Sequence, residues 1–336
     1  MPAPGTAARR IEGTARLGRR TKRLVAELEP GDVAVIEHPD LDRLSAEGLV
    51  RSAVACVVNV ATSSSGRYPN EGPVVLARAG VPLVDAPGAA LFRELSDGDL
   101  VVVEGGRVMA GGRTLATGRV IDRDAAGRAL AAARGALTSA LEAFAENTLA
   151  RLHEERGLVA GSMALPGLTT CFRGRPAVVA ARGRGHEDDV RALRPFVETR
   201  RPALVGVDGG ADVLLAAGLS PDVIVGDMDS ASDAALRCGA ELLLHAYPDG
   251  HAPGGPRLDE LGLAYRVIPA VGTSEDVALL LAAELGARPV VSVGSPLDLV
   301  EFLDRARDGM ASTFLTRLRI GEVLVDARGL SRLYPP

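Results

Sequence analysis

The sequence has little of several residue types, and each shortage excludes a kind of chemistry. It contains no tryptophan and only 3% aromatic residues, and Lys22 is the single lysine among 38 basic residues. The folded segments that follow it therefore have no lysine for a Schiff base or for a P-loop. Arginine carries almost all of the positive charge.

Cysteine and long apolar runs are also scarce. Cys56, Cys171 and Cys238 are odd in number and far apart, so neither a disulfide framework nor a zinc site is indicated. No apolar N-terminal segment follows Met1, and the apolar stretch 53–61 is about half as long as a membrane-spanning helix. We therefore expect a cytoplasmic protein.

Length and charge limit the partners. A chain of 336 residues with 47% hydrophobic residues suits two domains, each with its own core. The formal charge of -5 argues against nucleic acid as a partner, because nucleic-acid binding usually requires a strongly basic surface. A small phosphorylated ligand, held locally, is the polyanion we expect.

The N-terminal segment is basic. Seven Arg and Lys side chains stand against one acid, Glu12, within residues 1–26. This pattern predicts a basic tail over residues 1–29. The alternative is a segment that docks on an acidic partner or an anionic membrane.

Residues 30–122 alternate short β-rich runs with glycine and proline, which predicts a mixed α/β domain. The expected strands or β-rich runs are 33–36, 54–60, 74–76, 81–84, 100–103 and 119–121, with a helix over 40–50. This layout resembles the swivelling β/β/α domain of phosphoenolpyruvate-utilising enzymes. The phosphorylatable histidine of those enzymes has no counterpart in residues 63–70, so phosphohistidine transfer is not expected. The hydroxyl-rich segment 62–67 is either an ordinary loop or an anion site.

The sequence of residues 123–160 predicts one long helix that connects the two domains. No proline interrupts the segment, and Leu130, Leu137 and Phe144 follow a heptad spacing. These three apolar side chains could pair with those of a second copy in a homodimer, or they could pack against the chain's own domains.

Residues 161–325 predict a second domain with a parallel sheet, followed by a C-terminal tail over 326–336. From Pro176 onward strands and helices alternate, which is typical of a sheet covered on both faces. The expected strands are 178–181, 203–207, 222–225 and 267–270, and the expected helices are 187–199, 211–217 and one that begins at residue 273 or 274. Ligands of such sheets bind beyond the carboxyl ends of the strands.

Carboxylates gather at those strand ends. Asp208 follows the second strand, and Asp227 and Asp229 follow the third, about 6–7 Å apart on one side of an extended segment. Crowded carboxylates raise one another's pKa unless a cation lies among them. Mg²⁺ bridging to phosphate oxygens is the cation that suits such a cluster. The alternative is a set of solvated turn aspartates.

Glycine and arginine accompany the carboxylates. Arg182, Gly183 and Arg184 follow the first strand, where glycine lets a ligand approach the backbone and arginine can hold phosphate. Further candidates for ligand binding are Gly209, Gly210, Ser230, Thr273 and Ser274, with Asp276 as a fourth metal ligand. His186, beside the glycine-rich turn, is either part of the site or an ordinary core histidine.

Three segments resemble thiamine pyrophosphokinases. Val207-Asp-Gly-Gly-Ala211, residues 219–230 and Ser274-Glu-Asp276 are similar to the D-G-G-A, P-D-x-I-x-G-D-x-D-S and T-D motifs of that family. The resemblance implies aspartates that hold Mg²⁺ and the triphosphate of ATP for pyrophosphoryl transfer. Two features depart from it. The K-D-x-T-D motif reads Gly272-Thr-Ser-Glu-Asp276, and the stretch after Gly294 lacks the β-rich thiamine-binding domain. With so few aromatic rings, thiamine is not the expected substrate.

The chain as a whole resembles the SteA family of actinobacterial cytokinetic-ring proteins, notably in residues 66–70, 182–188 and 309–319. The resemblance implies a cell-division scaffold or regulator at the septum, with a membrane-bound partner and a C-terminal membrane helix beyond residue 336. Three functions stay open: a scaffold that binds Mg²⁺ and ATP or another nucleotide, an active ATP-dependent diphosphokinase, and an interaction module with a vestigial site.

Overall fold

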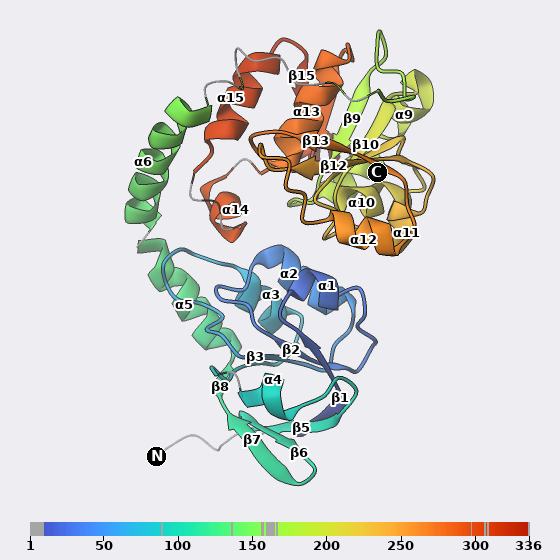
Figure 1. Cartoon of the computed structure of the whole chain (residues 1–336). Helices are drawn as coiled ribbons and strands as arrows, with labels where there is room; N and C mark the ends of the chain where they lie inside the picture. The colour runs from blue at the N-terminus through green and yellow to red at the C-terminus, as the bar shows by residue number, and fades with distance from the viewer. Residues whose placement is uncertain are drawn as a thin grey trace. The chain divides into compact units, whose positions relative to one another are not determined.

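The computed structural model describes residues 10–88, 90–135, 137–155, 158, 165, 167–296, 298–305, 307 and 309–334. Backbone contacts divide the chain into two units. Unit 1 comprises Met1–Ala143 with Leu303–Arg307, and unit 2 comprises Phe144–Phe302 with Asp308–Pro336. Each unit has its own sheet and core (Figure 1). The prediction of an α/β protein with parallel strands is confirmed.

Unit 1 contains an eight-stranded mixed sheet. Its order is β7-β6-β5-β1-β2-β3-β4-β8. β1 to β4 are parallel, whereas β5 and β8 run antiparallel to β1 and β4. The strands are β1 (Arg10–Gly18), β2 (Val33–Ile36), β3 (Cys56–Asn59), β4 (Leu83–Asp85), β5 (Leu100–Glu104), β6 (Arg107–Ala110), β7 (Arg113–Thr117) and β8 (Arg119–Ile121).

The predicted basic tail is wrong from residue 10 onward. Residues 10–18 form β1, which pairs with β5 on one side and β2 on the other. Alternation buries Ile11 and Ala15, while Arg16 pairs with Asp97 at 2.9 Å. Arg10 and Arg16 thus lie on the face of β1 opposite its buried side chains, and residues 1–9 lie outside the described part.

Both faces of the unit 1 sheet are covered. Val33 and Val35 pack toward α4 and β5, whereas Ala34 and Ile36 pack toward α1, α2 and α3 (Figure 1). The helices are α1 (Thr21–Leu24), α2 (Arg43–Arg51), α3 (Gly72–Arg78), α4 (Ala90–Glu94) and α5 (Arg123–Gly135). The β-rich run expected at 74–76 is wrong. It lies in α3, where Pro73 occupies the first turn and Leu76 is the buried contact.

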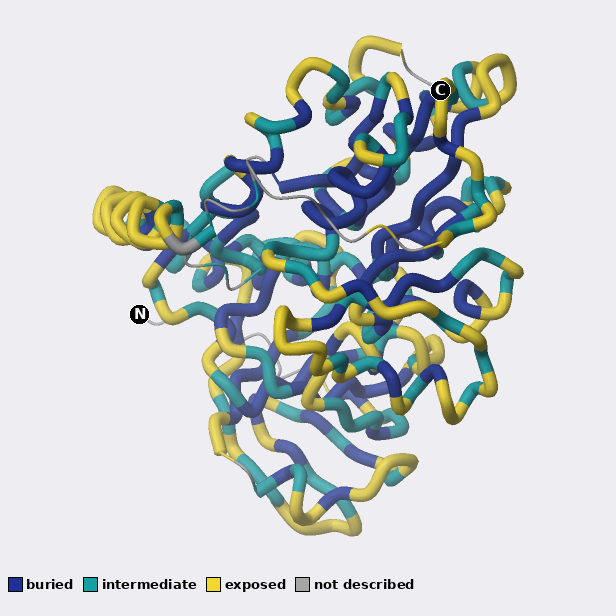
Figure 2. The backbone as a smooth tube through the Cα atoms, turned by 45° about the horizontal axis from the view of Figure 1, so that its top comes forward, coloured by how far each residue is buried: buried dark blue, intermediate teal, exposed yellow. Residues whose placement is uncertain are grey.

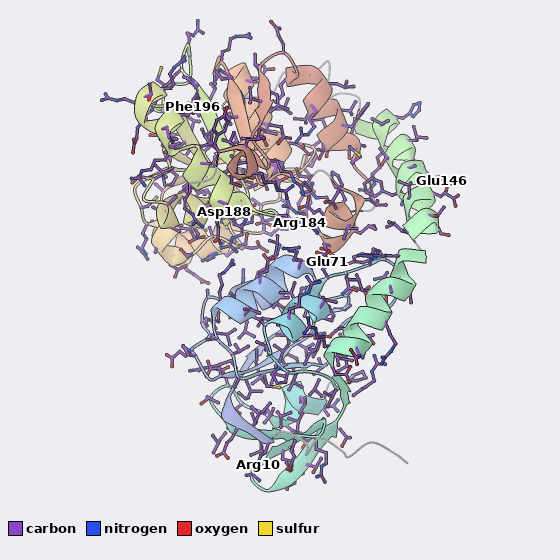
Figure 3. The ribbon with its side chains drawn as sticks, turned by 180° about the vertical axis from the view of Figure 1, so that it is seen from behind. Arg10, Glu71, Glu146, Arg184, Asp188 and Phe196 are labelled. Atoms are coloured by element: carbon purple, nitrogen blue, oxygen red, sulfur yellow. The ribbon has the colours of Figure 1, made fainter. Side chains whose placement is uncertain are left out.

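Within the span of the predicted connecting helix, the described residues form α5 and α6 (Leu137–Glu155), and residues 136, 156, 157, 159 and 160 are outside the described part. Phe144 of the predicted heptad packs on Phe302, with ring centroids 5.5 Å apart. Within unit 2, therefore, the chain itself covers this side chain. Most of α6 is exposed (Figure 2), including Leu141 and Leu149, and Glu146 points outward in Figure 3.

Unit 2 contains a seven-stranded sheet in which every described pairing is parallel. Its order is β13-β12-β11-β10-β9-β14-β15, so the chain changes direction across the sheet between β9 and β14. The strands are β9 (Ala177–Ala180), β10 (Ala203–Val207), β11 (Val223–Gly226), β12 (Glu241–Ala246), β13 (Tyr265–Pro269), β14 (Val290–Val293) and β15 (Leu324–Asp326). All carboxyl ends meet at one edge.

Helices cover both faces of this sheet. The apolar helix α13 packs on one face, and α8 to α12 with α16 pack on the other. Asp188 and Phe196, labelled in Figure 3, mark α8 and α9. The helices are α8 (His186–Ala192), α9 (Arg194–Arg200), α10 (Gly210–Ala216), α11 (Asp233–Leu236), α12 (Gly255–Glu260), α13 (Ser274–Glu284), α14 (Leu299–Asp304), α15 (Ala311–Ile320) and α16 (Leu330–Leu333). The single helix expected over 187–199 is two helices, α8 and α9.

The predicted C-terminal tail is ordered structure up to Tyr334. β15 pairs with β14, and the Asp189 carboxylate accepts hydrogen bonds from the N–H groups of Gly329 (2.8 Å) and Ser331 (2.9 Å). Across the described residues, no helix combines the length and the apolar character that a membrane crossing requires.

Candidate functional site

Asp208 is the centre of the carboxylate cluster. It follows β10 with a left-handed backbone (φ 48°), and its N–H donates to the Val225 carbonyl at 3.0 Å. Its Oδ1 accepts from the Met228 N–H at 3.0 Å. A Cβ on Gly226 would lie 1.8 Å from this Oδ1, so glycine in β11 leaves the space that the carboxylate occupies.

The surroundings of Asp208 disfavour the ionised form of its carboxylate. Burial raises the pKa of Asp208 well above its ordinary value, and the negative charges of Asp227, Asp229 and Glu275 raise it further. The hydrogen bond from Met228 opposes the shift but does not overcome it. A cation among these carboxylates would remove the repulsion.

The segment after β11 bends instead of continuing extended as the sequence pattern suggested. Met228 is fully buried with φ 63°, and the Asp229 N–H donates to Asp227 Oδ1 at 3.1 Å. Arg257 of α12 donates to the carbonyls of Met228 and Ala231, the second at 2.9 Å. Arg257 therefore stabilises the bend, while Asp227 stays exposed.

Several predicted residues do lie beside Asp208. Arg182 Nε donates to the Gly209 carbonyl at 3.1 Å, and the Gly209 N–H donates to Ser230 Oγ at 3.4 Å. A Cβ on Gly210 would lie 1.9 Å from the Ala180 carbonyl oxygen, so this glycine allows α10 to approach β9 closely. The structure thus gathers one arginine and two glycines next to the carboxylates.

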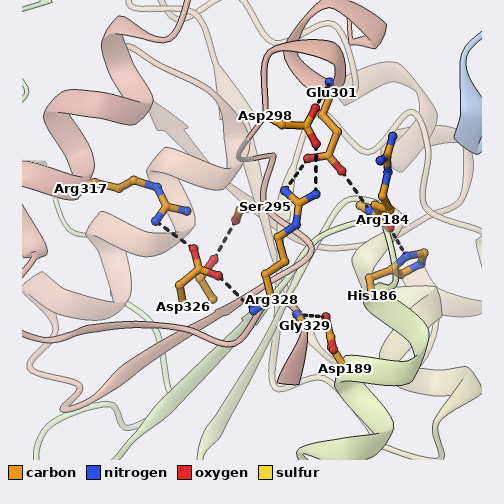
Figure 4. Close-up of polar contacts among 12 residues, drawn as sticks. Arg184, His186, Asp189, Ser295, Asp298, Glu301, Arg317, Asp326, Arg328 and Gly329 are labelled. Atoms are coloured by element: carbon orange, nitrogen blue, oxygen red, sulfur yellow. Dashed lines mark hydrogen bonds and ion pairs between the residues drawn. The ribbon is translucent and has the colours of Figure 1, made fainter. Parts of the chain in front are cut away.

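Arg184 and His186 belong to a different network (Figure 4). The Arg184 N–H points to Glu301 Oε1 at 3.4 Å, and Arg328 pairs with Glu301 at 2.6 Å. His186 is buried with Nδ1 beside the Gly183 carbonyl oxygen, so Nδ1 carries the proton and the ring supports the glycine-rich turn. A Cβ on Gly183 would lie 2.1 Å from the Gly294 carbonyl oxygen, so the loops after β9 and β14 touch there.

Asp276, expected to bind metal, caps a helix instead. Its Oδ2 accepts from the Thr273 N–H (3.0 Å), Thr273 Oγ1 (2.8 Å) and Ser312 Oγ (2.7 Å), and the Thr273 hydroxyl accepts from the Asp276 N–H. This is a capping box at the start of α13. This geometry assigns Asp276 and Thr273 a structural role, because Asp276 Oδ2 and the Thr273 hydroxyl satisfy the helix end and Oδ2 also binds Ser312 of α15.

Sequence reasoning missed three side chains at this edge. Glu275 is buried and acts on Asp208, although it directly precedes the aspartate that was expected to bind metal. Arg257 comes from a segment without any motif. His245 of β12 lies with Nδ1 3.2 Å from Ser274 Oγ and Nε2 3.1 Å from the Ala270 carbonyl oxygen. Since a carbonyl only accepts, Nε2 carries the proton and Nδ1 accepts from Ser274.

The carboxylates fit Mg²⁺ only in combination with a ligand. Among the residues that the structure describes, no three His, Cys, Asp or Glu side chains form a metal-binding group. Mg²⁺ keeps several waters and usually binds one or two carboxylates together with phosphate oxygens, so it does not require a complete protein cage. Asp208 with Asp227 or Asp229 supplies that donor set.

Unit 1 has its own polar edge at the carboxyl ends of β2, β3 and β4. Asp40 accepts from Ser65 Oγ (2.9 Å) and Arg67 Nη2 (2.7 Å), and Asp85 accepts from Ser63 Oγ (2.6 Å). In the loop predicted as a possible anion site, Arg67 and the hydroxyls of Ser63 and Ser65 therefore bind buried carboxylates of their own unit. This geometry favours the alternative, an ordinary structural loop.

In comparisons with known proteins, the chain matches no protein-family model and no curated protein.

Proposed function

We propose that unit 2 binds the phosphate groups of a magnesium–nucleotide complex and that the protein acts as a nucleotide-responsive regulator. The supporting observation is the raised pKa of Asp208, which burial and three neighbouring carboxylates cause. A protein keeps such a repulsive arrangement where a ligand compensates for it. Asp208, Asp227 and Asp229 would hold Mg²⁺, and Arg182 would contribute positive charge to the phosphates.

The parallel sheet supports the same proposal. The carboxylates follow β10 and β11, and the loops after β9 and β14 meet at the point where the strand order reverses. Crevices outside the carboxyl ends of parallel strands, near such a reversal, are the usual ligand sites of this kind of sheet. When bound, Mg²⁺ would neutralise the phosphates. The chain's own contribution is to place the carboxylates, through the bend at Met228, and to hold Arg182 over Gly209.

For the biological setting, we propose a role in cell division at the septum, based on the resemblance to the SteA family of cytokinetic-ring proteins and to pyrophosphokinases. A membrane-bound partner, a homodimer and a septal location stay predictions. Fluorescence microscopy of the tagged full-length protein in dividing cells tests the location, and light scattering tests the homodimer.

A thermal unfolding experiment tests the nucleotide site. With Mg²⁺ and ATP at about 100 times the Kd, binding would stabilise the protein by about 2.7 kcal/mol. Asp227→Asn should lose most of this shift, and Asp124→Asn, the same charge change in α5 of unit 1, should retain it. Wild-type protein that unfolds identically with and without Mg²⁺–ATP would overturn the proposal.

A second candidate is an active diphosphokinase that uses the same carboxylates, because positioning Mg²⁺ and phosphates is most of what such a transfer requires. The Ser274 hydroxyl, which lies 3.2 Å from His245 Nδ1, is at the same edge of the sheet. The same samples distinguish the two functions by product analysis. AMP that appears only when an acceptor alcohol is added would make the protein an enzyme, whereas a thermal shift without AMP supports a binding regulator.

A further inference from the structure

An exposed aromatic pair follows β12. Tyr247 is 60% exposed, and its ring lies parallel to the His251 ring at 4°, with centroids 6.1 Å apart. Such an offset arrangement is favourable for two aromatic rings. The His251 ring thus supports one face of the Tyr247 ring.

The turn that carries the pair is held by its own backbone. The Tyr247 N–H donates to the His251 carbonyl at 2.9 Å, and the Gly250 N–H donates to the Tyr247 carbonyl at 2.8 Å. Asp249 Oδ1 accepts from the His251 N–H at 2.9 Å. The two rings are therefore presented by a closed turn, and little backbone freedom is lost if a ligand stacks on them.

This turn belongs to the carboxylate edge. Leu244 of β12 pairs with Gly226 of β11, so Tyr247 follows β12 at the same edge of the sheet at which Asp227 follows β11. The chain then returns to the carboxylates, because a Cβ on Gly254 would lie 2.0 Å from the Asp227 carbonyl oxygen. The turn 247–251 and the segment that begins with Asp227 thus lie at the same edge of the sheet.

An exposed tyrosine alone would be unremarkable, since single apolar side chains are common on surfaces. The described part of the chain exposes three large aromatic side chains, Tyr247, Phe314 and Tyr334. Phe314 lies in α15 and Tyr334 follows α16 near the C-terminus, so only Tyr247 comes directly after a strand at the carboxylate edge.

We propose that the face of Tyr247, supported by His251, stacks on the planar base of a nucleotide whose phosphates lie at Asp208 and Asp227. This proposal rests on the function proposed above, and it adds which side chain contacts the base of the nucleotide. Every nucleobase offers a π face, so stacking would add affinity without selecting one base strongly.

Calorimetric titration of the full chain in the presence of Mg²⁺ tests this, with ATP and inorganic tripolyphosphate as the two probes. Tripolyphosphate carries the phosphates without the base. Tyr247→Ala should weaken ATP binding by about 5- to 150-fold, the range seen when a stacked aromatic is removed, and should leave tripolyphosphate binding unchanged. Tyr247→Phe should keep the ATP affinity, and Tyr334→Ala, at an equally exposed tyrosine, should change neither probe.

The outcomes separate the two proposals. If both probes bind wild-type protein and Tyr247→Ala leaves ATP binding unchanged, the stacking inference is wrong and the phosphate site stands. If Tyr247→Ala weakens the binding of both probes equally, the stacking inference is also wrong, because the turn would then support the phosphate site and not contact the base. If neither probe binds the wild type, the proposed function fails and the inference fails with it.

Discussion

The carboxyl ends of the parallel strands carry acids in both units, but the two units surround these acids differently. In unit 1, burial raises the pKa of Asp85, while hydrogen bonds from Ser63 and the charge of Arg119 act against the rise. In unit 2, burial raises the pKa of Asp208, and the charges of its neighbours raise it further. The same topology thus holds one loop in place in unit 1 and leaves a repulsive cluster in unit 2.

The comparison teaches where to look for a ligand. An acid whose neighbours donate to it already has its partners, so it contributes to stability. An acid whose neighbours are other acids lacks compensation from the chain, which points to a cation or its complex. Substitutions and pH series in both units can test this difference.

The largest expected effect is in unit 1. Asn59 is fully buried and accepts from the N–H groups of His38 and Ala61, while its amide donates to the His38 carbonyl and Ser63 Oγ. Asn59→Ala leaves these groups without a partner, and we expect a loss of about 3 kcal/mol in the free energy of unfolding. Urea unfolding measures it. Asn147→Ala, on the exposed side of α6, should cost less than about 1 kcal/mol.

A substitution at the unit 2 cluster should have the opposite sign. Asp208→Asn removes a repelled charge, and Asn keeps an acceptor for the Met228 N–H and tolerates the left-handed backbone. We expect a gain of about 0.5–2 kcal/mol at pH 7 without Mg²⁺, together with loss of the Mg²⁺–ATP shift. Asp85→Asn is the matched control, and it should destabilise by about 1 kcal/mol because Ser63 loses an acceptor. A loss of stability in Asp208→Asn would contradict the contrast between the units.

The pH dependence of the free energy of unfolding tests the same contrast between the two units. Because the folded-state pKa of Asp208 is raised, its contribution is fully present below the unfolded value of about 3.9 and is lost as pH rises through the folded value. Chemical unfolding of metal-free protein at a series of pH values should therefore show wild type losing stability relative to Asp208→Asn as pH rises. Curves that stay parallel from acidic to neutral pH would show that Asp208 is not repelled.

The smallest effect concerns an acid that unit 2 does satisfy. At the start of β12, burial acts against the charge of Glu241, but hydrogen bonds from Thr169 and Thr170 prevail and lower the pKa of Glu241 to about 2. Its contribution is present above the unfolded value of about 4.3 and is lost as pH falls toward 2. Glu241→Gln should flatten the stability profile between these values by less than about 1 kcal/mol, because glutamine keeps an acceptor oxygen for the N–H groups of Thr169 and Thr170. An unchanged profile would assign the acid sensitivity elsewhere.

The sequence predicted the elements best where one local signal was strong. Residues 33–36, 203–207 and 119–121 are short apolar or β-branched runs between turn residues, and they form β2, β10 and β8 with the expected bounds. The helix expected to begin at residue 273 or 274 is α13, and Thr273 is its N-cap. The prediction failed at residues 10–18, because arginines at the exposed positions concealed the alternation of a strand that is central to its sheet.

The candidate site was only partly visible in the sequence. The strand ends identified Asp208, Asp227 and Asp229 because parallel strands bring their carboxyl ends to one edge. No spacing could show that Asp276 turns toward its own helix end, that Glu275 faces the cluster, or that Arg257 holds the bend from another helix. These roles depend on side-chain direction and on contacts between segments far apart in the chain.

By itself, the sequence determined the α/β class, the parallel sheet of unit 2 and the strand ends where acids collect, because periodicity and turn residues act locally. Only the tertiary structure decided which acids are satisfied and which repel one another. It placed Ser63 against Asp85 and Gly226 against Asp208, and the charge state of a buried carboxylate depends on the partners within a few ångströms, not on its neighbours in sequence.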